Sequence, residues 1–232
     1  MAGGSPPRVS VVIPTWNEAS TIVACLTRLS RQGVDEVVVA DADSPDGTAE
    51  LAAALGVRVL RSLRGRGVQQ NRGAAATTGD VLLFLHADCW LEDGAIDQLR
   101  RFVARNPKVP AGCFRMRVAD GDPRFRPIDA AAHLRAGVLG LPYGDQALFV
   151  PRPVFERVGG FPEVPLMEDV CLALRLRRLG RIALLPAQVY TSARRWRRLG
   201  ITRQTLRNWS LTALAALGVR LEVLARLYPA IR

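Results

Sequence analysis

The architecture of this chain follows from one stretch, Gly79-Asp80-Val81-Leu82-Leu83-Phe84-Leu85-His86-Ala87-Asp88. The apolar run at 81–85 is too short for a helix and predicts a strand that is covered on both faces. His86 and Asp88 follow directly, separated by one alanine. Because ligands of open α/β sheets bind beyond the carboxyl ends of the strands, this polar pair predicts a binding crevice. The alternative is that Asp88 only caps the next turn.

On the amino-terminal side of this stretch, short apolar runs alternate with amphipathic segments. We expect strands at 9–13, 36–40 and 57–60, and helices from about residue 20, over 49–56 and over 68–78. A loop rich in arginine and glycine, 61–67, precedes the last of these helices. Strands separated by helices of this length predict right-handed βαβ units and a parallel sheet.

Beyond Asp88 the alternation is less regular. We expect a helix over 96–103, strands at 113–118 and 146–150, a helix at 170–179, and an amphipathic helical region at 203–232 that breaks near Gly218. The prediction is therefore one α/β domain with a mainly parallel sheet flanked by helices. It has two functional halves, 9–88 and 89–200, and a helical tail, 201–232.

Composition limits the class of protein. The 232 residues are 49% hydrophobic and carry a net charge of +11, so the chain can bury a core and suits anionic ligands or surfaces. The four cysteines are far apart and form no CxxC pair, which argues against a disulfide framework or zinc site. No apolar run approaches the ~20 residues of a membrane span, and we expect a cytoplasmic protein.

Several motifs resemble those of family 2 glycosyltransferases with the GT-A fold, in the same order along roughly residues 9–196. They are Val9-Ser10-Val11-Val12-Ile13-Pro14-Thr15-Trp16-Asn17-Glu18, Val37-Val38-Val39-Ala40-Asp41-Ala42-Asp43, Ala87-Asp88 at the position of the DxD motif, Gly159-Gly160-Phe161, and Met167-Glu168-Asp169. The stretches 64–71, 143–146 and 191–196 look most like a bacterial subgroup labelled for arsenosugar biosynthesis. The resemblance implies transfer from a UDP- or GDP-sugar to a small-molecule or lipid-linked acceptor, with 9–88 binding the nucleotide sugar and 89–200 the acceptor.

The resemblance also implies which residues bind the nucleotide. The base and ribose would contact the loop after the first strand and the end of the second, and arginines near the 61–67 loop would meet the diphosphate, because guanidinium forks match phosphate oxygens. The predicted nucleotide-binding residues are Pro14, Thr15, Asn17, Glu18, Asp41, Arg66, Asn71, Arg72, His86 and Ala87. The alternative is that Asn17 and Glu18 cap a helix, and that most of the arginines are solvated.

Asp88 is the predicted metal ligand. A carboxylate together with diphosphate oxygens suits Mg²⁺ or Mn²⁺, whose charge would stabilise the leaving diphosphate. The sequence departs from the family pattern because His86 replaces the first acid of the DxD motif. His86 either bonds the ribose or shifts the preference toward Mn²⁺. The other histidine, His133, lies in an alanine-rich helical stretch and is not expected to bind the metal.

Asp169 and Glu168 are the predicted catalytic residues. The resemblance implies that Asp169 is the general base of an inverting displacement with an oxocarbenium-like transition state. Two acids at a helix start can instead simply favour the helix dipole. Asp145, Gln146, Arg195 and Trp196 are predicted contacts of the donor sugar or acceptor. The basic, amphipathic tail is expected to pack on the domain as a helix. The alternative is that it contacts an anionic leaflet peripherally.

Three other functions remain open at this point. A non-catalytic nucleotide-sugar-binding scaffold is favoured by the missing first acid, and a nucleotidyltransferase would use similar groups. Nucleic-acid binding fits the charge, but aromatic residues are only 6% and no stacking platform is evident, so no nucleic-acid partner is expected.

Overall fold

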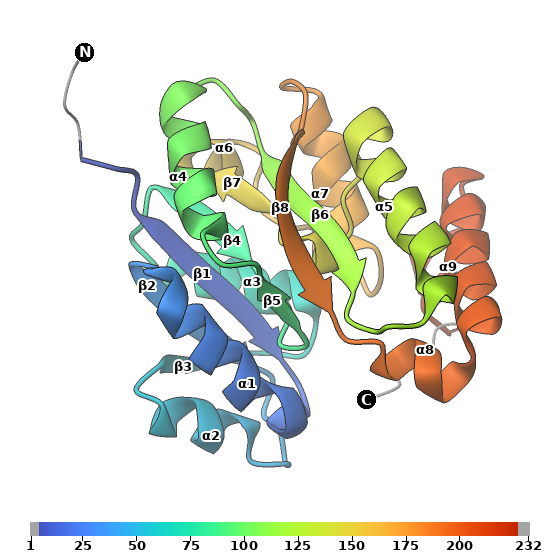
Figure 1. The fold of residues 1–232 in the computed structure, drawn as a ribbon, viewed down its shortest axis with the longest axis horizontal. Coiled ribbons are helices and arrows are strands. Elements are labelled where there is room, and N and C mark those ends of the chain that lie inside the picture. Colours follow the sequence, from blue (N-terminus) through green and yellow to red (C-terminus); the bar gives the residue numbers. More distant parts are fainter. Residues whose placement is uncertain (1–4, 227–232) are drawn as a thin grey trace.

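The computed structural model describes residues 5–226 and has a mixed sheet at its centre with helices on both sides (Figure 1). Within these residues the sheet has eight strands. Their order across the sheet is β3 (Arg58–Arg61), β2 (Glu36–Asp41), β1 (Val9–Thr15), β4 (Val81–Phe84), β7 (Phe149–Pro151), β6 (Gly112–Val118), β8 (Ala183–Thr191) and β5 (Cys89–Leu91).

The pairing of the strands divides the sheet into two parts. β1 pairs in parallel with β2 and β4, and β2 with β3, as the βαβ pattern predicts. β7 is antiparallel to both β4 and β6, and β5 is antiparallel to β8, while β6 and β8 run parallel. The expected mixed, mainly parallel sheet is confirmed.

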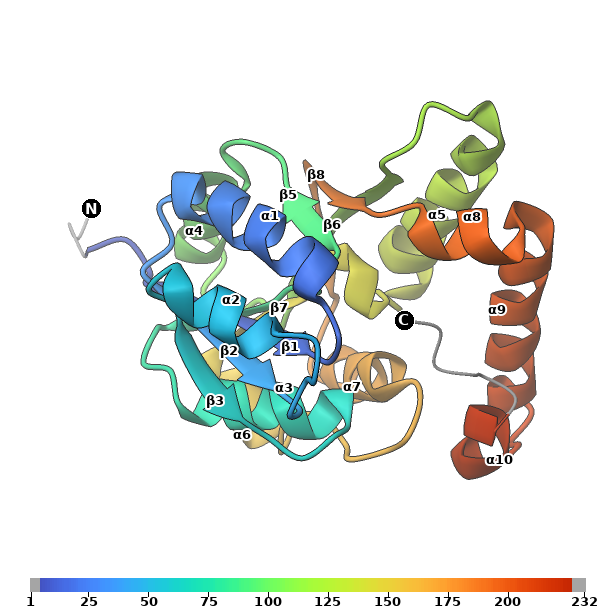
Figure 2. The ribbon, with the colours of Figure 1, turned by 90° about the horizontal axis from the view of Figure 1, so that it is seen from below.

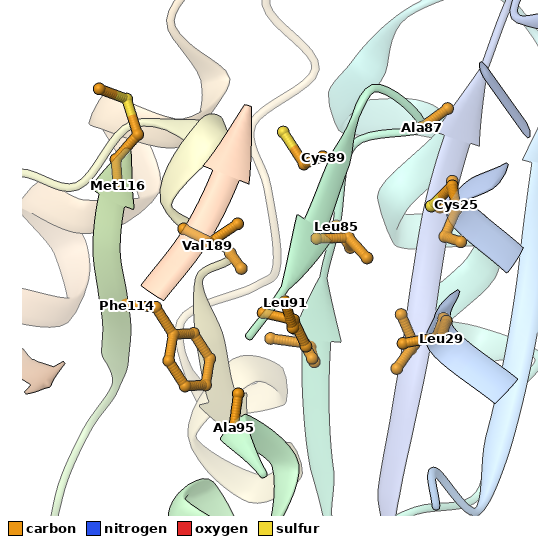
Figure 3. Close-up of a cluster of buried hydrophobic side chains, with 14 of the residues drawn as sticks. Cys25, Leu29, Leu85, Ala87, Cys89, Leu91, Ala95, Phe114, Met116 and Val189 are labelled. Carbon is orange, nitrogen blue, oxygen red and sulfur yellow. The ribbon is translucent and has the colours of Figure 1, made fainter. Parts of the chain in front are cut away.

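Helices cover the sheet in two layers. One layer contains α1 (Ala19–Leu29), α2 (Thr48–Ala54), α4 (Ala95–Arg105) and α5 (Arg126–Leu139), which pack into the larger apolar cluster drawn in part in Figure 3. The other contains α3 (Arg66–Ala75), α6 (Arg152–Arg157) and α7 (Glu168–Arg177), around a second cluster. Figure 2 shows α1 and α4 on one side of the sheet and α3, α6 and α7 on the other.

The strand β4 is buried on both faces, as the apolar run predicts. Leu83 and Leu85 belong to the larger cluster, whereas Leu82 and Phe84 belong to the second one. None of these four side chains is more than 2% exposed. Their burial fixes the carboxyl end of β4, and with it His86 and Asp88, in the middle of the sheet.

Several predicted boundaries are wrong. α3 begins at Arg66, inside the expected loop, because Gly65 takes a backbone φ of +141° that turns the chain into the helix. The strand expected at 146–150 is only Phe149–Pro151. Gln146 ends a short 3₁₀ helix, η3 (Gly144–Gln146), and Ala147 follows with a φ of +47° that interrupts any strand there. α7 begins at Glu168, before the expected residue 170.

Two strands, β5 and β8, have no counterpart in the sequence-based prediction. β8 contains Pro186, which cannot donate a ladder hydrogen bond. Its pairing with β6 passes from Leu185 directly to Gln188, so Pro186 lies in a bulge. The strand continues through Val189 to Thr191 and ends at the same sheet edge as Asp88.

The predicted helical tail consists of α8 (Arg194–Leu199), α9 (Ile201–Ala216) and α10 (Leu221–Arg226). The predicted break near Gly218 is confirmed, since Gly218 has a φ of +86° between the last two helices. Positions 227–232 of the predicted tail lie outside the described residues. Among the helices of residues 5–226, none is both long and apolar enough to span a bilayer.

Candidate active site

A cavity of about 160 Å³ lies where the ends of β1, β4 and β8 meet the start of α7. Residues of the η3 turn, α8 and α9 complete its wall. The cavity brings together many of the predicted site residues, which are Pro14, Glu18, Arg66, His86, Ala87, Asp88, Asp145, Glu168, Asp169, Arg195 and Trp196. Residues separated by more than 170 positions in the sequence therefore share one pocket, as the convergence of strand ends predicts.

The carboxylate of Asp169 is fixed by backbone amides on both oxygens. Oδ2 accepts a 2.5 Å hydrogen bond from the N–H of Gly144, and Oδ1 accepts a 2.7 Å bond from the N–H of Val170. The preceding residue, Met167, has a φ of +62°, a left-handed conformation that is unusual for a side chain of this size. This turn places Asp169 at the amino terminus of α7, facing the cavity.

Gly144 lies in close contact with His86. A Cβ atom added at Gly144 would be 2.6 Å from both Cε1 and Nε2 of the imidazole, and 3.4 Å from Oδ2 of Asp169. A side chain at this position would therefore force the His86 ring or the turn to shift. The η3 turn thus joins His86, which lies two residues beyond β4, to the start of α7.

Two further carboxyl groups of the cavity are held in an environment that favours their neutral form. The pKa of Glu168 is raised to about 7, mainly by burial and also by the charge of Asp169, while Arg66, 3.8 Å away, opposes the shift. Burial likewise raises the pKa of Asp145 to about 6; Arg135 opposes this, and the charges of Asp169 and Asp88 reinforce it. Oδ1 of Asp145 is buried and accepts no hydrogen bond from the described residues. Raised carboxyl pKa values in a cleft are typical of catalytic sites.

Three side chains could hold a metal ion beside the cavity. Ligand atoms of His86, Asp88 and Cys89 all lie within 4.8 Å of one another, and Asp88 and His86 line the pocket. Cys89 lies beneath them, with Sγ 3.6 Å from Oδ1 of Asp88. A carboxylate and an imidazole suit a divalent cation such as Mn²⁺ or Mg²⁺, so these residues fit one. His133 is elsewhere, with Nε2 hydrogen-bonded to the carbonyl of Met116.

The structure places Asp41 in a local network at the ends of β1 and β2. Its Oδ1 accepts hydrogen bonds from the hydroxyls of Thr15, at 2.7 Å, and Ser44, at 2.6 Å. Its Oδ2 accepts from the backbone N–H of Ser44, and Asp41 is 2% exposed. Ser44 also accepts a bond from the N–H of Asn17. Asp41, Thr15 and Asn17 therefore support the loop beside the cavity and do not line it.

Glu18 links the two halves of the domain. Its carboxylate accepts a bond from Arg194, at 3.1 Å, and one from the hydroxyl of Thr21 in the first turn of α1. Arg194 also donates to the hydroxyl of Ser20. The chain after β8 is thereby joined to the loop after β1, on one side of the cavity.

Three other predicted contacts lie outside the cavity. The amide of Asn71 makes two 2.9 Å bonds with the backbone of Phe161, so it joins α3 to the Gly160-Phe161 turn. Gln146 is fully buried and accepts a bond from Arg135. Arg72 is exposed on α3.

Sequence reasoning missed two sets of residues that shape the site. Gln69 donates from one amide nitrogen to the carbonyls of Thr15 and Ala40, at 2.7 and 2.8 Å, and so joins the ends of β1 and β2. Asn208, Leu211 and Thr212 of α9 line the cavity. The hydroxyls of Thr212 and Tyr143 lie 2.7 Å apart and hydrogen-bond α9 to the residue before η3. No short motif marks these long-range contacts.

The sheet, its helices and the cavity at the strand ends define a GT-A-type domain. The chain belongs to glycosyl transferase family 2, whose family model matches residues 10–161. Among solved structures, Staphylococcus aureus TarS in complex with UDP-GlcNAc superimposes with a TM-score of 0.64 at 19% identity, covering 80% of this chain and 58% of that one. The mannosyltransferase PcManGT of Pyrobaculum calidifontis, in complex with GDP-Man and Mn²⁺, gives 0.62 at 24% identity, covering 79% and 57%.

Curated relatives match shorter segments. The glycosyltransferase AglE of Haloferax volcanii is 36% identical over 104 residues, 38% of this chain and 34% of its own length. A dolichol-phosphate mannosyltransferase of Pyrococcus furiosus is 29% identical over 146 residues, 58% of this chain and 42% of its own length. A PGL/p-HBAD biosynthesis glycosyltransferase of Mycobacterium bovis is 38% identical over 107 residues, 42% and 41%. The chain thus spans less than half the length of these relatives, and they do not confirm the arsenosugar subgroup.

Proposed function

We propose that this domain transfers a hexosyl group from a UDP- or GDP-sugar to an acceptor hydroxyl, with inversion at the anomeric carbon. The observation that carries the proposal is the placement of Asp169. Its carboxylate is fixed by the amides of Gly144 and Val170 in the same cavity as Asp88. One carboxylate is thus oriented for a proton transfer, and another is available for the charge of a departing diphosphate.

Asp169 is the general base of the proposed reaction. The acceptor oxygen attacks the anomeric carbon while its proton passes to the carboxylate of Asp169. The bond between the anomeric carbon and the β-phosphate oxygen breaks, and the nucleoside diphosphate leaves with the bonding electrons. A single displacement of this kind inverts the configuration. Burial raises the pKa of Glu168 to about 7, which reduces the negative charge that this residue places beside the base.

Asp88, assisted by His86, would hold a divalent cation beside the diphosphate of the donor. Mn²⁺ or Mg²⁺ supplies positive charge for the leaving oxygen when it is bound there. PcManGT, a structural neighbour of the same fold, is described in complex with GDP-Man and Mn²⁺. Arg66 lines the cavity close to Glu168, where its guanidinium can reach a phosphate, and Arg72 follows on the same helix.

The nucleotide occupies the half formed by 9–88, along Pro14, Glu18 and Ala87, with Thr15, Asn17 and Asp41 holding the loop in place. The donor sugar and the acceptor lie between Asp145, Arg195 and Trp196 in the second half. Asn71 and Gln146 support these positions through their bonds to Phe161 and Arg135. The four cysteines are free, which suits a reducing cytoplasm, where nucleotide sugars are available.

A second candidate is a nucleotide-sugar-binding protein without transfer activity. The specific observation that favours it is His86 at the position where an acid is usual for the family. Both functions predict nucleotide binding, and only the first predicts turnover.

The test is a transfer and hydrolysis assay of the purified protein with UDP- and GDP-sugars and Mn²⁺, on the wild type and Asp169→Asn. Release of nucleoside diphosphate that depends on Asp169 supports the proposal. Tight nucleotide binding with no release from any donor would favour the non-catalytic candidate.

A further inference from the structure

Helix α9 carries apolar side chains on the face that it turns away from the protein. Leu206 is 56% exposed, Trp209 53% and Leu217 81%, and with Ala213 they are spaced by three or four residues along one stripe. We call Leu206, Trp209, Ala213 and Leu217 the outer stripe. In Figure 2, α9 stands at the edge of the molecule, away from the central sheet.

The opposite face of the same helix is more polar and is turned inward. Gln204 is 1% exposed and Leu211 4%, and Asn208 and Thr212 line the cavity. A helix on the surface of a globular protein normally has the reverse arrangement, with its apolar side toward the core. Exposed apolar stripes of this kind mark surfaces that contact another apolar phase.

The charge around the outer stripe selects the partner. Between residues 194 and 226 there is one acid, Glu222, and eight arginines, a net charge of +7. Ion pairs with Glu18 and Asp120 engage Arg194 and Arg197, and Arg220 pairs with Glu222. A second copy of the same face would bring like charges together, whereas an anionic bilayer attracts them and accepts leucine and tryptophan at its interface.

We propose that α9 docks on an anionic lipid bilayer through the outer stripe, with its long axis in the plane of the surface. Exposed arginines of this segment, such as Arg203 of α9, meet the headgroups, and Leu206, Trp209 and Leu217 enter the boundary with the acyl chains.

This docking places the cavity at the membrane, because the inner face of the same helix forms part of its wall. Resting on the proposed glycosyl transfer, it identifies the acceptor class as a lipid, or a molecule held on a lipid, that carries the accepting hydroxyl. The Tyr143–Thr212 hydrogen bond connects α9 to the residue before η3, and so connects the docked helix to the cavity wall.

The test is flotation of the full chain with vesicles of phosphatidylcholine, with and without roughly 30% phosphatidylglycerol, at low and high salt. We expect binding to the anionic vesicles, weakened by salt. Leu206→Ser with Leu217→Ser should lower the partition coefficient by roughly tenfold or more, because each buried leucine contributes strongly to insertion. The matched control is Leu55→Ser with Leu63→Ser, two leucines that are 45% and 79% exposed on the amino-terminal half.

A blue shift of the fluorescence on vesicle binding that is lost in Trp209→Phe would support the same placement. Absence of binding at low salt, or an equal loss in the Leu55/Leu63 control, would overturn the proposal. So would sedimentation showing a dimer that Leu206→Ser with Leu217→Ser converts to a monomer. Nucleotide titration without vesicles separates the docking of α9 from the proposed glycosyl transfer. Nucleotide binding without docking overturns only the docking. Docking without nucleotide binding overturns only the proposed function.

Discussion

The backbone N–H of Gly144 donates a 2.5 Å hydrogen bond to Oδ2 of Asp169, and this bond connects two segments 25 residues apart. It joins η3 to the first turn of α7, and Gly144 also contacts the ring of His86. The orientation of Asp169, the proposed base, thus depends on the backbone of Gly144, a residue without a side chain.

Asp169→Asn should reduce turnover by roughly 10²–10⁴-fold, because the amide cannot accept the acceptor's proton. The affinity for the nucleoside diphosphate should change little. Steady-state kinetics and calorimetry measure the two quantities. Glu163→Gln, an exposed acid in the loop before α7, is the control and should behave like the wild type. Full activity of the Asp169→Asn protein would remove Asp169 from the mechanism.

Gly144→Ala should damage both folding and activity. The new Cβ would lie 2.6 Å from the imidazole of His86, so the turn or the ring must move. Overpacking of this kind costs about 1–3 kcal/mol, which urea unfolding can measure. Gly121→Ala is the control, since nothing lies within 4 Å of its Cβ position. Equal stability of the two variants would contradict the close contact.

The pH dependence of stability should reflect Glu168. Burial raises its pKa from 4.5 to about 7, so between these values the folded state binds more protons than the unfolded state. The free energy of unfolding should therefore fall as the pH rises through this window, by on the order of 3 kcal/mol for a shift of this size. Urea titrations at about pH 5 and about pH 8 measure the change.

Glu168→Gln should reduce this dependence, because the amide does not ionise, and the raised pKa of Asp145 should account for part of what remains. The exposed acid variant Glu163→Gln should retain the wild-type slope. If Glu168→Gln leaves the slope unchanged, Glu168 is charged throughout the range and its burial does not matter for stability.

Gln69→Leu should destabilise the domain by about 1–3 kcal/mol, because the carbonyls of Thr15 and Ala40 lose a buried donor. Gln70→Leu is the matched control. Gln70 is equally buried, at 2% exposed, and its Oε1 is unbonded among residues 5–226, so its removal should cost less. Thermal or urea unfolding of both variants compares them, and an equal loss would contradict the bridging role of Gln69.

The sequence predicted the structure correctly where the local pattern of apolar and polar residues matches the burial of those residues. The buried strand at β4 and the polar pair after it could be predicted, because apolar residues on both faces need a sheet covered on both sides. The acids at 168 and 169 were singled out by their resemblance to a family motif, and they lie in the first turn of α7.

The remaining features depend on contacts that no local pattern records. β8 was missed because Pro186 resembles a break and becomes part of a bulge only when β6 is beside it. Gln69 and Asn71 are polar residues of a helix, and their roles depend on carbonyls brought in from β1, β2 and Phe161. The contribution of α9 to the cavity required knowledge of where the tail packs.

The most direct test of the account is calorimetric titration with UDP, GDP and their sugar derivatives, with and without Mn²⁺ or Mg²⁺, on the wild type and Asp88→Ala. We predict that one nucleotide binds in a metal-dependent manner and that Asp88→Ala removes the metal dependence. Binding that is indifferent to both the metal and Asp88 would contradict the assignment of this cavity as a metal-assisted donor site.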